Sequence, residues 1–172
     1  MAKLPIVRTI EELREAVHHW RVRGKTVAFV PTMGSLHEGH LSLVKTARPH
    51  ADRTVVSIFV NPIQFAPNED FAAYPRDEQR DHALLTTAKA DLLYAPNVDG
   101  MFPDDFSTRV EVIGLTSRLE GASRPHHFSG VTTVVTKLFM QCLPDVAVFG
   151  EKDYQQLLVI RQMTRDLNMP IR

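Results

Sequence analysis

The sequence predicts an α/β fold in which a doubly wound, mostly parallel sheet is covered by helices on both faces. Helical and strand-like segments alternate along the chain, a pattern that favours parallel strands joined by helical crossovers. The main strand segments are apolar nearly throughout, as expected of strands that are covered on both faces. Polar clusters directly follow three of these strands, where open parallel sheets bind their ligands. We therefore expect one Rossmann-like domain over residues 1–172.

The expected elements follow from local signals. Thr9 is the expected cap of a first helix that carries Glu11 and Glu12 in its first turn and stops at Gly24. Strands are expected at 25–30, 54–60, 91–94 and 145–149, with a more exposed strand at 109–113. Further helices are expected at 41–49, 77–89, 130–142 and 154–167. The segment 61–75 is rich in turn residues and predicts a loop.

Composition and charge narrow the class of protein. The chain has 172 residues, of which 44% are apolar, and this is enough for a sizeable core. Twenty basic and twenty acidic residues give a formal net charge of zero, which points away from nucleic acid and anionic membranes as partners. The single cysteine, Cys142, excludes an internal disulfide and a thiolate-rich zinc site. With no secretory leader and no apolar run of about 18 residues, we expect a cytoplasmic location.

The strongest functional signal is PTMGSLHEGH at residues 31–40. It lies between an apolar strand and a helix start, which together offer backbone N–H groups and a positive dipole end to an anion. Gly34 and Gly39 let the backbone approach a ligand closely. His37 and His40 would share one face of the first helical turn, where they can donate hydrogen bonds to phosphate. The segment therefore predicts a nucleotide phosphate site.

Two histidines in one helical turn have other common explanations, such as plain surface positions or satisfied core groups. A zinc protease motif would need ligands four residues apart with a glutamate inside. Glu38 does lie between His37 and His40, but their spacing is three, and Gly39 would weaken a helix interior. The preceding Pro-Thr-Met-Gly favours the phosphate interpretation over both alternatives.

Two further polar clusters follow predicted strands. Asn61 and Gln64 carry neutral amides that suit the hydroxyl or carboxylate oxygens of a small substrate, although Asn-Pro is also an ordinary turn. The segment 150–153, Gly-Glu-Lys-Asp, follows the last strand. Lys152 suits phosphate, and Asp153 suits ribose, Mg²⁺ or a helix cap. We expect all three clusters to meet in one pocket at the carboxyl ends of the strands.

The remaining polar residues leave alternatives open. Gln155 and Gln156 point in different directions on a helix, so at most one of them is expected to face the pocket. A fourth polar group could contact phosphate or could be plain surface; it comprises Arg118, Arg124, His126 and His127.

Taken together, the motifs resemble those of the pantoate–β-alanine ligase family, within the nucleotidyltransferase superfamily that carries a HIGH-type motif. The matching segments occur in the family's order: PTMGSLHEGH at 31–40, SIFVNPIQF at 57–65, YPR at 74–76, LEGASRP at 119–125 and VFGEKDYQQL at 148–157. His-Glu-Gly-His at 37–40 fills the HIGH position. The resemblance implies ATP-dependent condensation of (R)-pantoate with β-alanine through pantoyl adenylate, with release of AMP and pyrophosphate and with Mg²⁺ neutralising phosphate charge.

The resemblance also implies roles for individual residues. His40 stands where the family has its proton donor, and we expect both His37 and His40 to stabilise charge on the phosphates. The implied ATP site comprises Met33, Gly34, Ser35, Leu36, His37, Glu38, Gly39, His40, Gly150, Glu151, Lys152 and Asp153. The implied pantoate site comprises Gln64, Gln156, Met33, Phe59, Val134 and Val135, with Gln64 also meeting β-alanine and Arg124 a candidate phosphate contact. The resemblance names no metal ligands, and it suggests a homodimer.

Two departures from the family pattern qualify this interpretation. Ser129 stands where the family commonly has arginine, which weakens a phosphate role for that loop. The chain also ends at Arg172, before the Ser-Ser-Arg-Asn segment that closes over the ATP phosphates in the family. We therefore expect an N-terminal, nucleotide-binding half without its C-terminal lid, which binds substrates with little turnover. The alternatives are a nucleotide-binding module and an adenylyltransferase of the same superfamily acting on another substrate.

Overall fold

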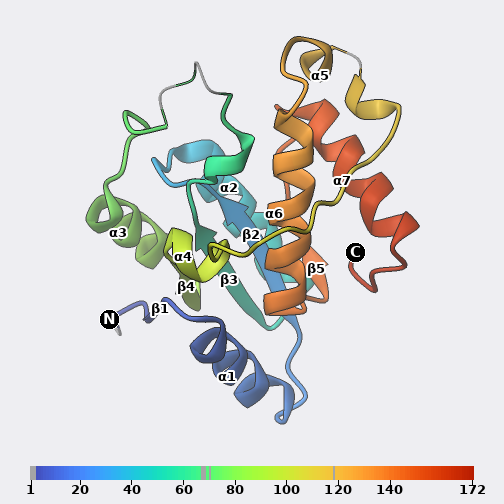
Figure 1. The fold of residues 1–172 in the computed structure, drawn as a ribbon. Coiled ribbons are helices and arrows are strands. Elements are labelled where there is room, and N and C mark those ends of the chain that lie inside the picture. The colour runs from blue at the N-terminus through green and yellow to red at the C-terminus, as the bar shows by residue number, and fades with distance from the viewer. Residues whose placement is uncertain (1–2, 67–68, 70, 118) are drawn as a thin grey trace.

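A computed structural model describes residues 3–66, 69, 71–117 and 119–172, and within them a parallel sheet forms the centre of the molecule (Figure 1). Its strands are β1 (Ile6–Val7), β2 (Val27–Thr32), β3 (Arg53–Ile58), β4 (Leu92–Tyr94) and β5 (Val146–Ala147). Their order across the sheet is β1-β4-β3-β2-β5, and each neighbouring pair is parallel. β2 lies between β3 and β5, so the segment that follows it lies between the carboxyl ends of these two neighbouring strands.

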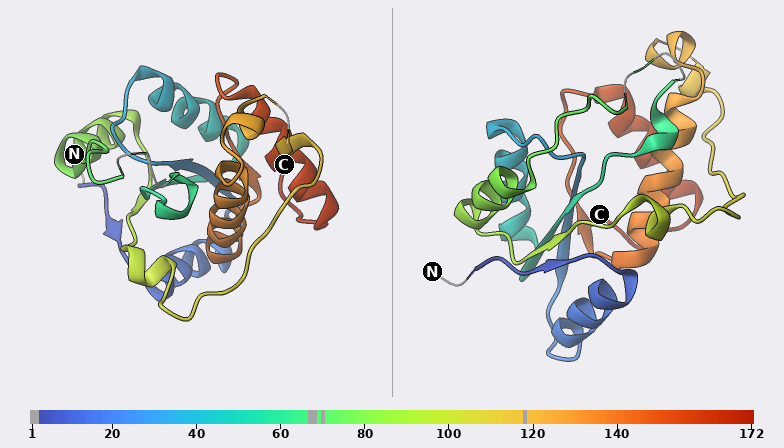
Figure 2. Two further views of the ribbon diagram at one scale, coloured as in Figure 1. Left: turned by 45° about the horizontal axis from the view of Figure 1, so that its top comes forward. Right: turned by 60° about the vertical axis from the view of Figure 1, so that its left-hand side comes forward.

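Helices cover both faces of this sheet, as the two views in Figure 2 show. The longer helices are α1 (Ile10–Arg21), α2 (Glu38–Ala47), α3 (Glu78–Ala88), α6 (His127–Cys142) and α7 (Tyr154–Asp166). Short helices are α4 (Val98–Met101) and α5 (Glu120–Ser123), with 3₁₀ turns at Arg48–His50, Pro62–Gln64 and Leu115–Ser117. This arrangement confirms the predicted α/β class with its parallel, doubly wound sheet.

Alternation along β2 divides the core into two clusters. Val27 and Phe29 face a cluster with α1, α6 and α7, whereas Ala28 and Val30 face a second cluster with α2 and α3. All four side chains are fully buried. Successive residues of a strand point to opposite faces, so a strand covered on both sides must be apolar at every position. The continuous apolar run in the sequence is therefore the direct signature of the two-sided core.

The first helix illustrates how well local signals fixed some boundaries. Thr9 Oγ1 accepts a hydrogen bond from the Glu12 N–H at 3.2 Å, and Glu12 Oε2 accepts one from the Thr9 N–H at 3.1 Å. This reciprocal capping box starts α1. Gly24 follows the helix with a φ of +69°, a left-handed conformation that suits glycine. By contrast, α6 begins at His127, three residues before the predicted start at Gly130.

The prediction of a strand at 109–113 is wrong, because this segment lies along α6 without joining the sheet. The Val110 N–H donates to Thr133 Oγ1 at 3.0 Å, and the Thr132 hydroxyl donates to the Val110 carbonyl. Helix side chains thus satisfy the backbone groups that a strand partner would satisfy in a sheet. The alternation of apolar and polar residues reflects an extended segment packed on one side, with Ile113 94% exposed.

The sequence analysis missed β1, which forms an edge of the sheet. Ile6 and Val7 lie opposite Leu93 and Tyr94 of β4 in a parallel pair. The Leu93 N–H donates to the Pro5 carbonyl at 3.0 Å, and the Ala95 N–H donates to the Val7 carbonyl at 2.9 Å. A strand of two residues is too short to show any periodicity, so only its partner strand reveals it.

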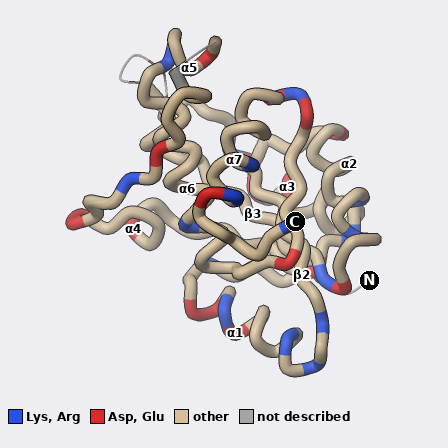
Figure 3. The backbone as a smooth tube through the Cα atoms, turned by 90° about the vertical axis from the view of Figure 1, so that its right-hand side faces the viewer, with Lys and Arg blue, Asp and Glu red and all other residues tan. Residues whose placement is uncertain are grey.

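The surface carries charges of both signs. Lys and Arg positions are interspersed with Asp and Glu positions on the face drawn in Figure 3, in keeping with the formal net charge of zero. Among the described residues, no helix combines the length and the apolar character that crossing a membrane requires.

Asp52 ties the starts of β2 and β3 together, and it makes stability depend on pH. Its carboxylate accepts from the Thr26 N–H at 3.0 Å, the Thr26 hydroxyl at 2.9 Å and Lys25 Nζ at 3.1 Å. The two bonds from Thr26, followed by that from Lys25, lower the pKa of Asp52 from 3.8 to about 2. A carboxyl whose pKa is lower in the folded state stabilises the fold above its unfolded pKa, and this contribution is lost as the pH falls.

We therefore expect Asp52→Asn to flatten the fall in unfolding free energy that the wild type shows between about pH 4 and pH 2. Urea unfolding at half-unit pH steps measures this dependence for the variant and the wild type. Identical slopes for the two proteins across that window would contradict the assignment.

Candidate active site

The predicted clusters lie at the carboxyl ends of β2, β3 and β5. The loop after β3 and the short helix α5 lie at the same end of the molecule in Figure 1. A pocket of about 460 Å³ opens beside the ends of β2, β3 and β4. Its lining includes Met33, Gly34, Phe59 and Asp81, but no residue of the segments 37–40, 61–65 and 150–153 that the prediction of one shared pocket requires. The structure therefore places a concave surface at the edge of the sheet that parallel α/β folds use for ligands.

The two histidines of the HEGH motif cap helix α2 together. The Gly39 N–H donates to His37 Nδ1 at 3.1 Å, and the His37 N–H donates to His40 Nδ1 at 3.4 Å. The two ring centroids are 4.2 Å apart, so the rings do share one face of the first turn, as predicted. A nitrogen that accepts a hydrogen bond carries no proton, so each neutral ring carries its proton on Nε2. Both histidines are thereby prepared to donate an Nε2–H bond to an anionic oxygen.

His40 is the more enclosed of the two rings, and its surroundings favour the neutral form. Burial lowers the pKa of His40 below its usual 6.5, and the neighbouring His37 lowers it further. Asp81 and Asp153 act in the opposite direction, while Lys152 lowers this pKa slightly. At neutral pH the ring is therefore an uncharged hydrogen-bond donor. The turn after β5 lies against α2, since a Cβ atom on Gly150 would lie 4.0 Å from Leu43 Cδ1.

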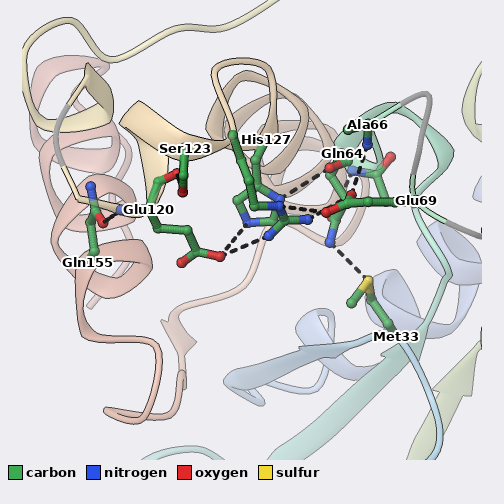
Figure 4. Close-up of polar contacts among 10 residues, drawn as sticks. Met33, Gln64, Ala66, Glu69, Glu120, Ser123, His127 and Gln155 are labelled. Atoms are coloured by element: carbon green, nitrogen blue, oxygen red, sulfur yellow. Dashed lines mark hydrogen bonds and ion pairs between the residues drawn. The ribbon is translucent and has the colours of Figure 1, made fainter.

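Gln64 joins the loop after β3 to the loop after β2. Its Oε1 accepts from Asn61 Nδ2 at 2.9 Å, and its Nε2 lies 3.0 Å from Met33 Sδ (Figure 4). Asn61 thus fixes which way the Gln64 amide points. A thioether sulfur is a weak acceptor, so the Gln64 N–H groups face a position where a ligand oxygen would bind them better. This contact brings the first two predicted clusters together.

Helix α6 packs against the backbone of Gln64. His127 Nδ1 donates to the Gln64 carbonyl at 3.2 Å, and Asn61 Nδ2 donates to the Gly130 carbonyl at 3.1 Å. A Cβ atom on Gly130 would lie 2.5 Å from the Ile63 carbonyl oxygen and 2.6 Å from Gln64 Cα. Only glycine allows this approach of the helix to the loop. Asn61 and His127, which the sequence analysis gave little weight, are therefore supports of Gln64.

Arg124 is paired with two carboxylates in this structure. Its guanidinium lies 2.8 Å from Glu69 and 2.8 Å from Glu120, the two carboxylates labelled in Figure 4. These partners raise the pKa of Arg124 further. Both edges of the guanidinium fork are thus engaged within the protein. A phosphate contact by Arg124 would require one of these pairs to open. His126 lies exposed nearby, and Arg118 lies outside the described residues.

Near the start of α7, the side chains of Gln155 and Asp153 differ in whether they hydrogen-bond to the protein. Gln155 donates to the Leu115 carbonyl at 3.0 Å and accepts from the Glu120 N–H at 3.1 Å, so its amide fastens α5 to α7. Of the two glutamines, Gln156 is therefore the candidate for the pocket. Asp153 precedes α7 as its N-cap residue, but its side chain makes no capping bond. The helix-cap alternative for Asp153 is thus not supported, which leaves a ligand role open.

The candidate apolar wall is buried in the core beside α6. Phe59, Val134 and Val135 belong to one hydrophobic cluster. Val134 and Val135 are both buried there, and their part in an apolar wall for the ligand stays a prediction.

Asp81 is a buried charged residue of the site that the sequence analysis did not single out. Its carboxylate accepts from the Ser35 N–H and from the Leu36 N–H, each at 2.8 Å. The N–H groups of Ser35 and Leu36 are therefore not available to phosphate, because Asp81 on α3 already accepts from them. Nothing in the sequence between residues 77 and 89 distinguishes Asp81 from a solvated helix position; only the tertiary contact does.

The parallel sheet, with the HEGH motif placed after β2 at the start of α2, defines a Rossmann-like α/β protein. The model of the pantoate–β-alanine ligase family matches residues 5–172, and the chain belongs to this family.

Known relatives agree with this assignment. The chain is 60% identical over 167 residues to pantothenate synthetase of Paramagnetospirillum magneticum, covering 97% of this chain and 59% of that protein. The crystal structure of pantothenate synthetase from Thermus thermophilus superposes with a TM-score of 0.93 at 54% identity, covering 98% of this chain and 59% of that one.

A pantoate–β-alanine ligase from Francisella tularensis, solved in complex with β-γ ATP and β-alanine, gives a TM-score of 0.92 at 39% identity. The match covers 98% of this chain and 65% of that one. The chain thus spans about three fifths of the length of these relatives.

Proposed function

We propose that this chain provides the ATP- and pantoate-binding part of a pantoate–β-alanine ligase. The observation that carries the proposal is the meeting of three strand ends at one place. The turn after β5 packs against α2, where a Cβ atom on Gly150 would lie 4.0 Å from Leu43 Cδ1, and Gln64 from the loop after β3 lies against Met33 from the loop after β2. Family membership and the nucleotide complex of the Francisella relative support the same conclusion.

In the first proposed step, a pantoate carboxylate oxygen attacks the α-phosphorus of ATP. The new P–O bond gives pantoyl adenylate, and the bond to the departing pyrophosphate breaks. Negative charge builds up on the phosphate oxygens during this displacement, and the Nε2–H groups of His37 and His40 are oriented to donate to them. Gln64 and Gln156 would hold pantoate through its oxygens. Catalysis then rests on positioning and electrostatics, without a covalent bond to the protein.

In the second proposed step, the amine of β-alanine attacks the acyl carbon of the adenylate. The amide C–N bond forms, AMP departs with the former carboxylate oxygen, and the amine loses its proton. Gln64 is the proposed contact of β-alanine as well as of pantoate. The adenylate must be shielded from water during this step, because hydrolysis would compete with attack by the amine.

We further propose that Mg²⁺ reaches the site on the ATP phosphates. Phosphate oxygens and water are the ligands that Mg²⁺ prefers. Among the described residues, no group of three His, Cys, Asp or Glu side chains could hold the ion unaided. A homodimer and a cytoplasmic location complete the proposal, and the buried free thiol of Cys142 is compatible with a reducing compartment.

The proposal is tested by isothermal titration with pantoate and, separately, with Mg·ATP, followed by an assay for pyrophosphate release. Saturable binding of pantoate and pantoate-dependent pyrophosphate release are expected. Release driven by phosphopantetheine in place of pantoate would identify an adenylyltransferase acting on another substrate. If a protein shown to be folded gives no binding signal with either pantoate or Mg·ATP, that result would contradict the assignment of the site to this chain.

Gln64→Ala is expected to weaken pantoate binding by at least about tenfold, because two oriented amide N–H donors are removed from a buried site. Titration of pantoate into the variant measures the loss. The exposed Gln79→Ala on α3 is the matched control and should bind pantoate as the wild type does. Equal affinities for all three proteins would exclude Gln64 from the site.

A further inference from the structure

We propose that Asp81 is a positioning residue of this active site: its carboxylate sets the backbone of the loop at 33–36 and thereby the placement of His37 and His40. The side chain is 1% exposed, although it is an aspartate on a largely polar helix. Both oxygens are used, Oδ2 by the Ser35 N–H and Oδ1 by the Leu36 N–H, each at 2.8 Å. A buried carboxylate held by two successive N–H groups is a specific arrangement, since an unpaired one would be strongly disfavoured. The inference rests on the proposed role of the histidines.

The loop that Asp81 holds has an unusual backbone. Gly34 has a φ of +82°, and Ser35, which has a side chain, has a φ of +52°. Left-handed conformations of non-glycine residues persist where surrounding contacts enforce them. A Cβ atom on Gly34 would lie 3.1 Å from Asp81 Oδ2 and 3.1 Å from Ile58 Cγ2, so the loop lies directly against the carboxylate. Asp81 is therefore the contact that holds Ser35 in this conformation.

A second contact from the same helix fixes the next peptide group. Arg80 Nη1 donates to the Leu36 carbonyl at 3.2 Å, while Asp81 accepts from the Leu36 N–H. Two successive residues of α3 thus hold both polar groups of Leu36. His37 follows immediately and caps α2, so the direction in which the chain leaves Leu36 determines where the imidazole pair lies.

The charge of Asp81 also acts on the site. A carboxylate that already occupies the N–H groups of Ser35 and Leu36 repels a second anion there. Phosphate is thereby directed toward the N-terminus of α2 and the histidines. The groups that face His40 are His37 on α2, Asp81 on α3, and Asp153 and Lys152 on the turn before α7. Of these, Asp81 is the carboxylate with the larger effect, and it raises the pKa of His40.

The test compares Asp81→Asn with Asp52→Asn in the purified protein. Asp52 is the matched control, because its carboxylate also accepts backbone and side-chain bonds at an end of β2, but at the end remote from the histidines. For Asp81→Asn we expect a lower pKa of His40 in an NMR titration, and a kcat for pyrophosphate release reduced by about tenfold or more with a smaller change in the KM for pantoate. Asp52→Asn should leave all three quantities unchanged.

A double variant separates positioning from folding. If Asp81 enforces the left-handed backbone of Ser35, then Ser35→Gly reduces the need for it, and Asp81→Asn should cost less kcat in a Ser35→Gly background than in the wild type. Additive losses in this cycle would overturn the proposal, as would an unchanged pKa of His40 in a folded Asp81→Asn.

If Asp81→Asn does not fold, the contact between Asp81 and the loop can be tested in the wild-type protein. The amide protons of Ser35 and Leu36 should exchange slowly with solvent deuterium, since both donate to a buried carboxylate. Rapid exchange at both amides in the folded protein would exclude the proposed contact. These readouts do not depend on turnover. A protein in which they behave as expected, yet which releases no pyrophosphate with pantoate, would retain the positioning role and lose the proposed reaction.

Discussion

His40→Ala is expected to lower the rate of pantoate-dependent pyrophosphate release by about 100- to 1,000-fold, the usual effect of removing one oriented donor from a developing negative charge. The ring is partly buried, its Nδ1 is occupied by the His37 N–H, and its Nε2–H is therefore free for a phosphate oxygen. Burial keeps the ring neutral by lowering its pKa, so the donor is present throughout the neutral pH range. Single-turnover measurement of adenylate formation isolates this step from product release.

Two matched variants sharpen that experiment. His37→Ala should cost less than His40→Ala, because the His37 ring is exposed and competes with water for its partner. His50→Ala, which changes an exposed histidine just after α2, should leave the rate unchanged. Equal losses for His37→Ala and His40→Ala would show that the pair acts as one unit, without a special role for His40. A wild-type rate in His40→Ala would remove the ring from the mechanism.

Local sequence patterns predicted two kinds of element correctly: a helix that begins at a capping box formed by nearby residues, and a strand that is buried on both faces. The capping box of Thr9 and Glu12 marked the start of α1, and the apolar run through Val27 and Phe29 marked a strand covered on both faces. Where contacts with residues distant in sequence determine the local structure, the alternation of apolar and polar residues was misleading. Residues 109–113 alternate as a strand would, but the hydroxyls of Thr132 and Thr133 satisfy Val110 in place of a strand partner.

The same division applies to the candidate site. The residues proposed to bind ligands directly were visible in the motifs, and they include His37, His40 and Gln64. The residues that orient them were not, because their chemistry is expressed only through contacts distant in sequence. Asp81 lies 46 residues from Ser35, and Gly130 supports Gln64 across a comparable separation. A glycine or aspartate within a helix has no sequence signal for such a role.

Gly130→Ala is expected to be the most damaging small substitution near the proposed pantoate site. The added methyl group would lie 2.5 Å from the Ile63 carbonyl oxygen and 2.7 Å from the Gln64 backbone nitrogen. These are backbone atoms, which cannot move aside as a flexible side chain can. Overpacking of this kind costs about 1–3 kcal/mol, and we expect a value near the upper end, measured by urea unfolding.

The displacement should also reach the ligand. If α6 shifts to relieve the contact, then the bond from Asn61 to the Gly130 carbonyl lengthens, and Asn61 no longer fixes the amide of Gln64. Pantoate affinity should therefore fall by more than about tenfold even where the protein remains folded, a loss of more than about 1.4 kcal/mol. Ser129→Ala, one residue earlier on α6, removes only a bond to Glu111 and should retain both stability and affinity. A Gly130→Ala variant that is destabilised but binds pantoate normally would show that the helix supports the fold without orienting Gln64.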